Sequence, residues 1–192
     1  MKPIPHPFRP AERGSALIIG LLLLLIMTII GLSMMSSTVM EERMAGNTRE
    51  RSLAFQAAEA ALRDAEQQIS SNTTGPYSPL QVAQFSTTCA SGRCRSAPDS
   101  PKWSAMTDAN WSSSQTAAYG SATGAAALAG VTTQPRYLIE YQGTQSLNPI
   151  QPGKSCDALL LITARGVGQN SNTVVFLQTV YRHHAGQCYD SI

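Results

Sequence analysis

ALIIGLLLLLIMTII fills residues 16–30, and no residue from 14 to 40 carries a charge. A helix needs about 20 consecutive apolar residues to cross the hydrocarbon core of a bilayer. The stretch Ser15–Val39 meets that length, and it holds glycine and serine at a level that membrane helices tolerate. The sequence therefore predicts one membrane-spanning helix near the N-terminus, and no comparable apolar run follows it.

Charge is scarce in the chain as a whole. Only 14% of the 192 residues are charged, against about a quarter in an ordinary soluble domain, while 43% are hydrophobic. Neutral polar residues replace the missing charge, since the chain contains 21 Ser and 16 Thr. A net charge of +2 gives no electrostatic footprint for nucleic acid. Plentiful aliphatic residues at low net charge argue against a disordered chain, so composition indicates a folded protein.

The residues before the apolar run are short and basic. Lys2, Arg9 and Arg13 oppose Glu12, which gives +2 over 14 residues. By the positive-inside rule the N-terminus stays in the cytoplasm and the remainder faces outward. Three interpretations compete: a secretory signal cut after Ser33, a plain signal anchor, and a leader cut before the apolar run. The run is longer than the h-region of a secretory signal, and the segment that follows favours the third interpretation.

The helical pattern continues beyond the apolar run. Residues 41–70 contain no proline and one glycine, and they are rich in alanine, which favours helix. A Gly-Pro pair at 75–76 ends the pattern, so one helix is predicted over residues 15–70. Two helices that break near Ser36 or Gly46 are the alternative. One apolar stripe with 3-4-3-4 spacing is expected to face the rest of the chain: Phe55, Ala58, Leu62, Ala65 and Ile69.

Strand signals appear in the last third of the chain. Residues 137–141, 158–164 and 173–181 are short runs rich in β-branched, aromatic or aliphatic side chains. The glycine- and asparagine-rich residues 166–172 predict a turn, so the last two runs form a hairpin. The expected fold class is α+β, with the long N-terminal helix packed on a small antiparallel sheet of three or four strands.

Residues 71–134 carry fewer signals. Ala125–Ala129 predicts a short helix. Trp103 and Trp111 lie in polar surroundings, and they either anchor a protein interface or pack loops onto the sheet. We favour the second interpretation, because buried tryptophans more often serve packing.

Three segments together resemble the type IV pilins, and among these the PilX-type minor pilins. Residues 13–20, which read RGSALIIG, are similar to the site that prepilin peptidase cuts. Residues 42–47 and 54–62 are similar to the N-terminal region of the PilX-type proteins. The resemblance implies a pilin-like fold and cleavage between Gly14 and Ser15, where a small, flexible glycine lets the backbone enter a protease.

One residue departs from the family pattern. Pilins of the shaft carry Glu at the fifth mature position, where this chain has Ile19, and in the family that carboxylate pairs with the terminal amine of a neighbouring subunit. A buried carboxylate is costly unless it is paired, and a subunit at the filament end has no subunit above it. Ile19 therefore fits a tip or initiating position. Ser15 stands where the family usually has Phe, which leaves the N-terminal methylation that the resemblance implies open.

The predicted topology places all four cysteines in an oxidising compartment, so disulfides are expected. Four cysteines allow three connectivities. We favour Cys89–Cys94, a tight loop, together with Cys156–Cys188, which resembles the C-terminal disulfide loop of many pilins. A zinc site that includes His183 and His184 is the alternative, although its spacing fits no standard zinc pattern. No metal ion or cofactor is expected.

The sequence contains no P-loop, GxGxxG, HExxH or GxSxG motif, so we expect a structural subunit and not an enzyme. The resemblance implies a minor pilin that helps prime pilus assembly, lies in the tip complex, and supports twitching motility and adhesion. Implied partners are prepilin peptidase, the inner membrane, other minor pilins, the major pilin and a tip adhesin. The alternatives are a minor pseudopilin of type II secretion and a membrane-anchored periplasmic binding domain that never polymerises.

The expected domain organisation follows from these segments. A leader is expected over residues 1–14, and the membrane and assembly half of the helix over residues 15–40. The amphipathic half follows over residues 41–70, and an extracytoplasmic head over residues 71–192. The chain is expected in the inner membrane before assembly and at the extracellular pilus tip afterwards.

Overall fold

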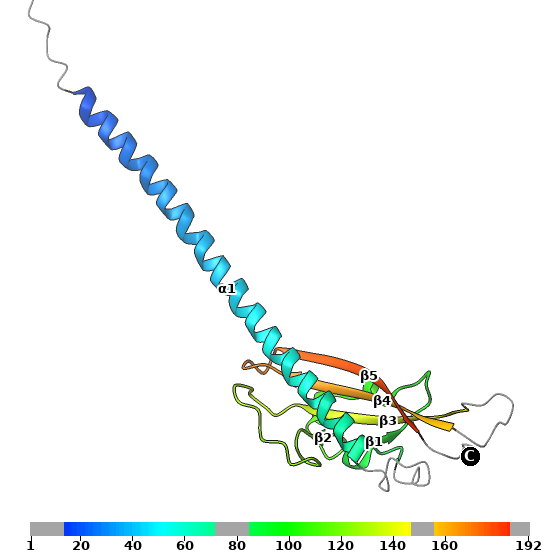
Figure 1. Ribbon diagram of the computed structural model, residues 1–192. Coiled ribbons are helices and arrows are strands. Elements are labelled where there is room, and N and C mark those ends of the chain that lie inside the picture. The colour runs from blue at the N-terminus through cyan, green and yellow to red at the C-terminus, as the bar shows by residue number, and fades with distance from the viewer. Residues whose placement is uncertain (1–13, 72–84, 147–155, 185–192) are drawn as a thin grey trace, which may run out of the picture. The chain divides into compact units, whose positions relative to one another are not determined.

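The computed structural model describes residues 14–71, 85–146 and 156–184 (Figure 1). Contacts within the chain divide it into two compact units, Met1–Asn47 and Thr48–Ile192. The elements follow in the order of one long helix, a loop region with two short strands, and three long strands at the end.

Helix α1 spans Ser15–Ser71 as one continuous element of 57 residues. The prediction of a single helix over residues 15–70 is confirmed, and no break occurs near Ser36 or Gly46. A side chain at Gly46 would meet no heavy atom within 4 Å, so the glycine does not mark a close approach that bends the helix. Alanine-rich sequence on both sides carries the helix through this position.

The part of α1 after residue 47 packs on the sheet through small side chains. The fully buried face of the helix consists of alanines and one isoleucine: Ala54, Ala58, Ala61, Ala65 and Ile69. The predicted stripe is therefore correct in direction but wrong at its start, because the Phe55 side chain is 46% exposed. A phenylalanine ring does not fit where the backbone of α1 approaches the strand at Gly166, and Ala54 takes that place.

The sheet has five strands and is mixed. The long strands are β3 (Arg136–Ser146), β4 (Cys156–Val167) and β5 (Val174–His184), and they pair antiparallel in that order. The predicted hairpin of the last two strands is confirmed, with Val167 opposite Val174. Two short strands pair with β3 on its other side: β1 (Arg93–Arg95), which is parallel, and β2 (Ala117–Ala118), which is antiparallel.

The expected α+β class with a long N-terminal helix is confirmed, while the sheet differs in detail from the purely antiparallel one predicted. The difference is β1, whose three residues carry too little pattern to indicate a strand. Its parallel pairing is fixed by contacts distant in sequence, since Cys94 lies opposite Glu140.

Two apolar clusters cover the two faces of the sheet. The larger cluster lies between α1 and the sheet and includes Tyr137, Ile139, Leu160 and Ile162. The smaller cluster lies on the other face and joins Leu138, the two cysteines 89 and 94, and Trp111, with Trp103 and Met106 packed against it. The two tryptophans therefore pack loops onto the sheet, which is the interpretation that we favoured.

The predicted helix over Ala125–Ala129 is wrong, because these residues adopt no helical structure. The side-chain amide of Gln134 accepts a hydrogen bond from the Leu128 backbone nitrogen and donates one to the Leu128 carbonyl oxygen, each at 2.9 Å. These bonds satisfy the Leu128 backbone within the loop, so a helical hydrogen bond is not needed there.

Candidate assembly surfaces

The predicted processing site lies at the first residues that the structure describes. Gly14 is exposed, and α1 begins at Ser15. A side chain at Gly14 would meet no heavy atom within 4 Å. The basic residues Lys2, Arg9 and Arg13 lie outside the described residues.

The apolar half of α1 is uncovered in the isolated chain. Ile19 is 57% exposed, and the other leucines and isoleucines between residues 17 and 32 are 45–73% exposed. Each such side chain gains about 1.5–3 kcal/mol when it leaves water, so this surface requires lipid or other helices around it. By length and composition α1 is able to cross a membrane, and it is the one helix among the described residues that meets these criteria.

Two carboxylates of α1 bind loops of the head. Asp64 is 3% exposed and accepts hydrogen bonds from the Gly120 backbone nitrogen, at 2.9 Å, and from the Thr123 hydroxyl. Glu50 accepts a hydrogen bond from the Asn170 backbone nitrogen at 2.8 Å, in the turn between β4 and β5. These two polar residues of the helix thus hold loops against it, a role that no local sequence pattern indicates.

The loop before β2 is bound to β3 by an arginine. The Arg136 side chain donates to the Thr116 hydroxyl at 2.6 Å and to the carbonyl oxygens of Ser113 and Thr116 at 2.7 Å. Burial lowers the pKa of Arg136 from its ordinary value, without removing its charge near neutral pH. This side chain therefore serves structure, and its hydrogen-bonding capacity is largely used within the chain.

A second buried carboxylate supports the opposite face of the sheet. Glu140 has an exposed fraction of zero, and its Oε1 atom accepts a hydrogen bond from the Lys102 backbone nitrogen at the start of the 3-10 helix η3 (Lys102–Ala105). Its Oε2 atom has no hydrogen-bond partner among the described residues. In the sequence, the only signal was a single acidic residue within the apolar run 137–141.

The predicted Cys89–Cys94 disulfide is present, with Cα atoms 4.2 Å apart. The chain turns tightly within it, since Cys89, Ser91 and Gly92 all adopt positive φ angles of 54–76°. A side chain at Gly92 would lie 2.6 Å from the Ala117 backbone nitrogen, so glycine is required where this loop meets β2. Cys156 is the first residue of β4, and Cys188 lies outside the described residues, so the pairing Cys156–Cys188 stays a prediction.

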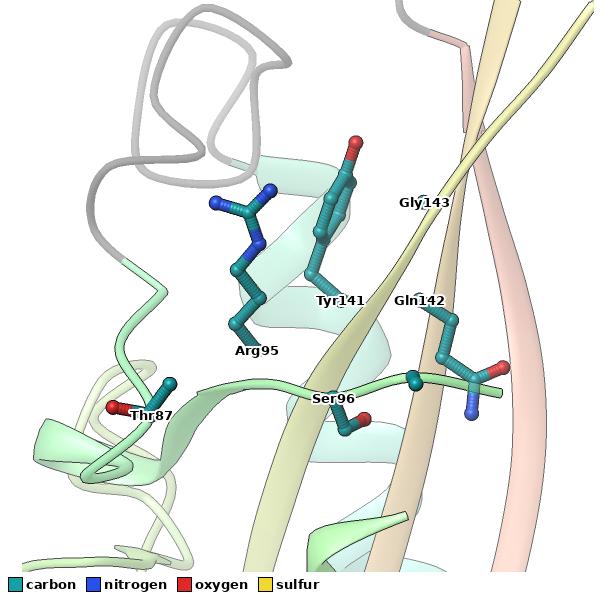
Figure 2. A pocket seen from close by; sticks show the side chains of 7 residues that line it. Thr87, Arg95, Ser96, Tyr141, Gln142 and Gly143 are labelled. Atoms are coloured by element: carbon teal, nitrogen blue, oxygen red, sulfur yellow. The ribbon is translucent and has the colours of Figure 1, made fainter. Parts of the chain in front are cut away.

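A cleft of about 420 Å³ lies between β1 and the bulge of β3 at Gly143. Figure 2 shows Arg95 and Tyr141 side by side in this cleft, with Thr87, Ser96 and Gln142 around them. Burial raises the pKa of Tyr141 above its ordinary value of 10.0, and the Arg95 guanidinium acts in the opposite direction. The described residues that line the cleft include no carboxylate, imidazole or thiol.

The part of the chain that the structure describes contains no group of three or more His, Cys, Asp or Glu side chains that could hold a metal ion. His183 lies in β5 and is partly buried, and its neighbour His184 ends the strand. Cys188 lies outside the described residues, so the zinc alternative with His183 and His184 stays a prediction.

A long helix with an uncovered apolar half, joined to a small sheet that its other half covers, is the arrangement of a pilin. Comparison with known families agrees: the pattern of the family described as PilX N-terminal matches residues 13–63, and that of Type IV pilus assembly protein PilX C-term matches residues 82–183. The chain belongs to the PilX family of type IV pilus assembly proteins. No curated protein and no solved structure matches it.

Proposed function

We propose that the chain is a minor pilin that helps prime pilus assembly and remains in the tip complex. The observation that carries this proposal is the uncovered apolar surface of α1 directly after the Gly14–Ser15 junction, in a chain of the PilX family. Before assembly this surface lies in the inner membrane, with the N-terminus cytoplasmic and the head periplasmic. During assembly it leaves the lipid and packs against the helices of other pilins.

The proposed domain organisation assigns one task to each segment. Residues 1–14 form the leader that prepilin peptidase removes, and residues 15–40 anchor the chain and enter the filament core. Residues 41–70 support the head, and residues 71–192 form the surface that meets other subunits. Partners are the other minor pilins, the major pilin and a tip adhesin, and the protein works by association and not by catalysis.

The tip position rests on Ile19. A carboxylate in the apolar filament core is stable only with a charged partner, and an end subunit lacks the neighbour that supplies it. Isoleucine at this position needs no partner, so the subunit is able to begin a filament. Twitching motility and adhesion then follow from the filament that the chain helps to start.

Substitution Gly14→Val tests the processing step. The branched valine side chain restricts the backbone that the peptidase must bind, so we expect the leader to remain and surface pili to be lost. Immunoblots of the membrane fraction measure leader removal, and sheared fractions measure pili. The matched control is Gly20→Val, because Gly20 also has open space around it and lies inside α1. Normal leader removal and normal piliation in the Gly14→Val strain contradict the proposal.

Substitution Ile19→Glu tests the tip assignment. If the missing carboxylate marks the tip, the variant gains the group that shaft subunits carry, and immunogold labelling should shift from pilus ends to the shaft. Ile18→Glu is the control, because it adds the same charge one position away and should only reduce incorporation. Labelling that stays confined to pilus ends, with an unchanged number of pili, argues against this role of Ile19.

A further inference from the structure

The exposed large apolar side chains of the unit Thr48–Ile192 gather at one edge of its sheet. Among the described residues after Asn47 these are Phe55, Phe176 and Val180, with exposed fractions of 46%, 44% and 58%. Phe176 and Val180 belong to β5, and their side chains share the face of the sheet that lies away from α1, since Phe176 contacts Trp111 with ring centroids 5.3 Å apart.

Phe55 lies beside the same edge on the helix-covered face. Phe55 and Asp64 are nine residues apart, which is two and a half helical turns, so they occupy opposite flanks of α1. Asp64 binds the loop at Gly120 and Thr123, directly after β2, on the far side of β3. Phe55 therefore lies on the flank of α1 that faces away from the β2 side of the sheet, toward the side where β5 is the last strand.

Strand β5 is the edge strand of this sheet, and within the described part of the chain it pairs with β4 alone. Natural proteins protect such edges with lysine, proline, bulges or short strands. β5 has none of these: it spans 11 residues, contains neither proline nor lysine, and keeps an unshifted register with β4. Apart from two histidines, Arg182 is the only basic or acidic residue of β5, and its side chain forms an ion pair with Asp157 at 3.5 Å.

We propose that the free edge of β5 binds an extended strand from another protein of the pilus assembly. Every second residue of an edge strand directs its backbone N–H and C=O groups outward, and a partner strand pairs with these groups. Alternate side chains of the added strand would then contact Phe176 and Val180 on one face and Phe55 on the other. A helical partner would cover one face only, whereas exposed apolar side chains are present on both.

This inference rests on the proposed function for the identity of the assembly, and the partner is specified by its chemistry. The partner segment is extended, about five or more residues long, apolar at alternate positions on both faces, and low in charge. Such a strand would extend the sheet beyond β5 and join two subunits through main-chain hydrogen bonds.

Photo-crosslinking of the full chain in its own cells tests the proposal. A benzoylphenylalanine residue is placed singly at Phe176, Gln178 or Val180, whose side chains all lie on the exposed face of β5, and at Ala90 as a control on the disulfide loop. Because paired strands advance together, the three β5 positions should crosslink to one segment of a different protein, at sites that shift by two residues per step. Ala90 should give no such series.

Three outcomes overturn the proposal: crosslinks to scattered segments, crosslinks to a second copy or to residues 185–192 of the same chain, and no protein crosslink at any β5 position. A second variant separates folding from binding. Val180→Lys places a charge at the edge and should reduce the Gln178 crosslink at least tenfold, while Val180→Thr keeps a β-branched side chain and should retain most of it. Equal crosslinking in both variants rejects a strand contact.

The two proposals fail separately. If Gly14→Val abolishes pili and the crosslink series is absent, the strand contact is wrong and the pilin function stands. If the series is present and Gly14→Val leaves processing and piliation unchanged, the strand contact stands and the pilin function is wrong.

Discussion

At the residue scale, Gly166 sets how closely helix and sheet pack. A side chain on this β4 residue would lie 2.1 Å from the Ala54 carbonyl oxygen and 2.5 Å from the Ala58 backbone nitrogen. These are backbone atoms of α1, which cannot move aside as a flexible side chain would. The buried alanines of the helix and this glycine therefore form one contact, in which each side requires the other to be small.

Gly166→Ala should destabilise the head. The added methyl group forces α1 away from the sheet, and overpacking of this kind costs about 1–3 kcal/mol, with the upper end expected because backbone atoms collide. Urea unfolding of the full chain in detergent, followed by circular dichroism, measures the change. Gly46→Ala is the matched control: its new methyl group meets open space, and helix propensity favours it by about 1 kcal/mol. Equal stability of Gly166→Ala and the unsubstituted chain would contradict the packing described.

At the scale of elements, the helix and the hairpin were predictable and the short strands were not. Hydrophobic patterning over dozens of residues indicates α1, and β4 with β5 follow from apolar runs around a glycine-rich turn. β1 has only Arg93, Cys94 and Arg95, and its strand geometry depends on pairing with β3. A contact between segments 46 residues apart leaves no local pattern, so the sequence could not indicate it.

The residues of the candidate surfaces also fall into two groups: those with a local sequence pattern and those whose role depends on partners distant in sequence. Gly14, Ser15, Ile19 and the Cys89–Cys94 pair were all selected from local sequence features. The structure confirms the disulfide, and the roles of Gly14, Ser15 and Ile19 stay predictions. Asp64 and Glu140 gain their roles from partners 56 and 38 residues away, respectively. Phe55 was assigned to the buried stripe because periodicity gives the direction of a helix face and not the space available on the opposing sheet.

The disulfide loop fixes the position of β1. Replacing both cysteines, Cys89→Ser with Cys94→Ser, should lower the free energy of unfolding by about 2 kcal/mol, the loop entropy expected for so short a ring. Limited proteolysis with trypsin provides a local measurement, because Arg93 and Arg95 flank Cys94 and are partly buried. Cleavage there should become faster in the double variant and stay unchanged in Ala90→Ser, which alters the same exposed loop without breaking the bond. Resistance to trypsin in both variants would show that β1 does not depend on the disulfide.

At the scale of the whole molecule, two kinds of surface are available to bind other molecules. The apolar half of α1 needs lipid or other helices, and the β5 edge offers main-chain groups beside exposed apolar side chains. Among the described residues, no group of three or more His, Cys, Asp or Glu side chains could hold a metal ion. Surfaces that bind by packing and strand pairing agree with membership in a family of type IV pilus assembly proteins.

The central claim is that this chain is cut between Gly14 and Ser15 and then incorporated into a pilus. Mass spectrometry of sheared, purified pili tests it most directly, because it measures both location and N-terminus. The pilus fraction should contain the chain with Ser15 as its first residue, and it should contain no peptide from residues 1–14. A chain that remains in the inner membrane with residues 1–14 attached, or one that begins after Ser33 and is absent from pili, would contradict this claim.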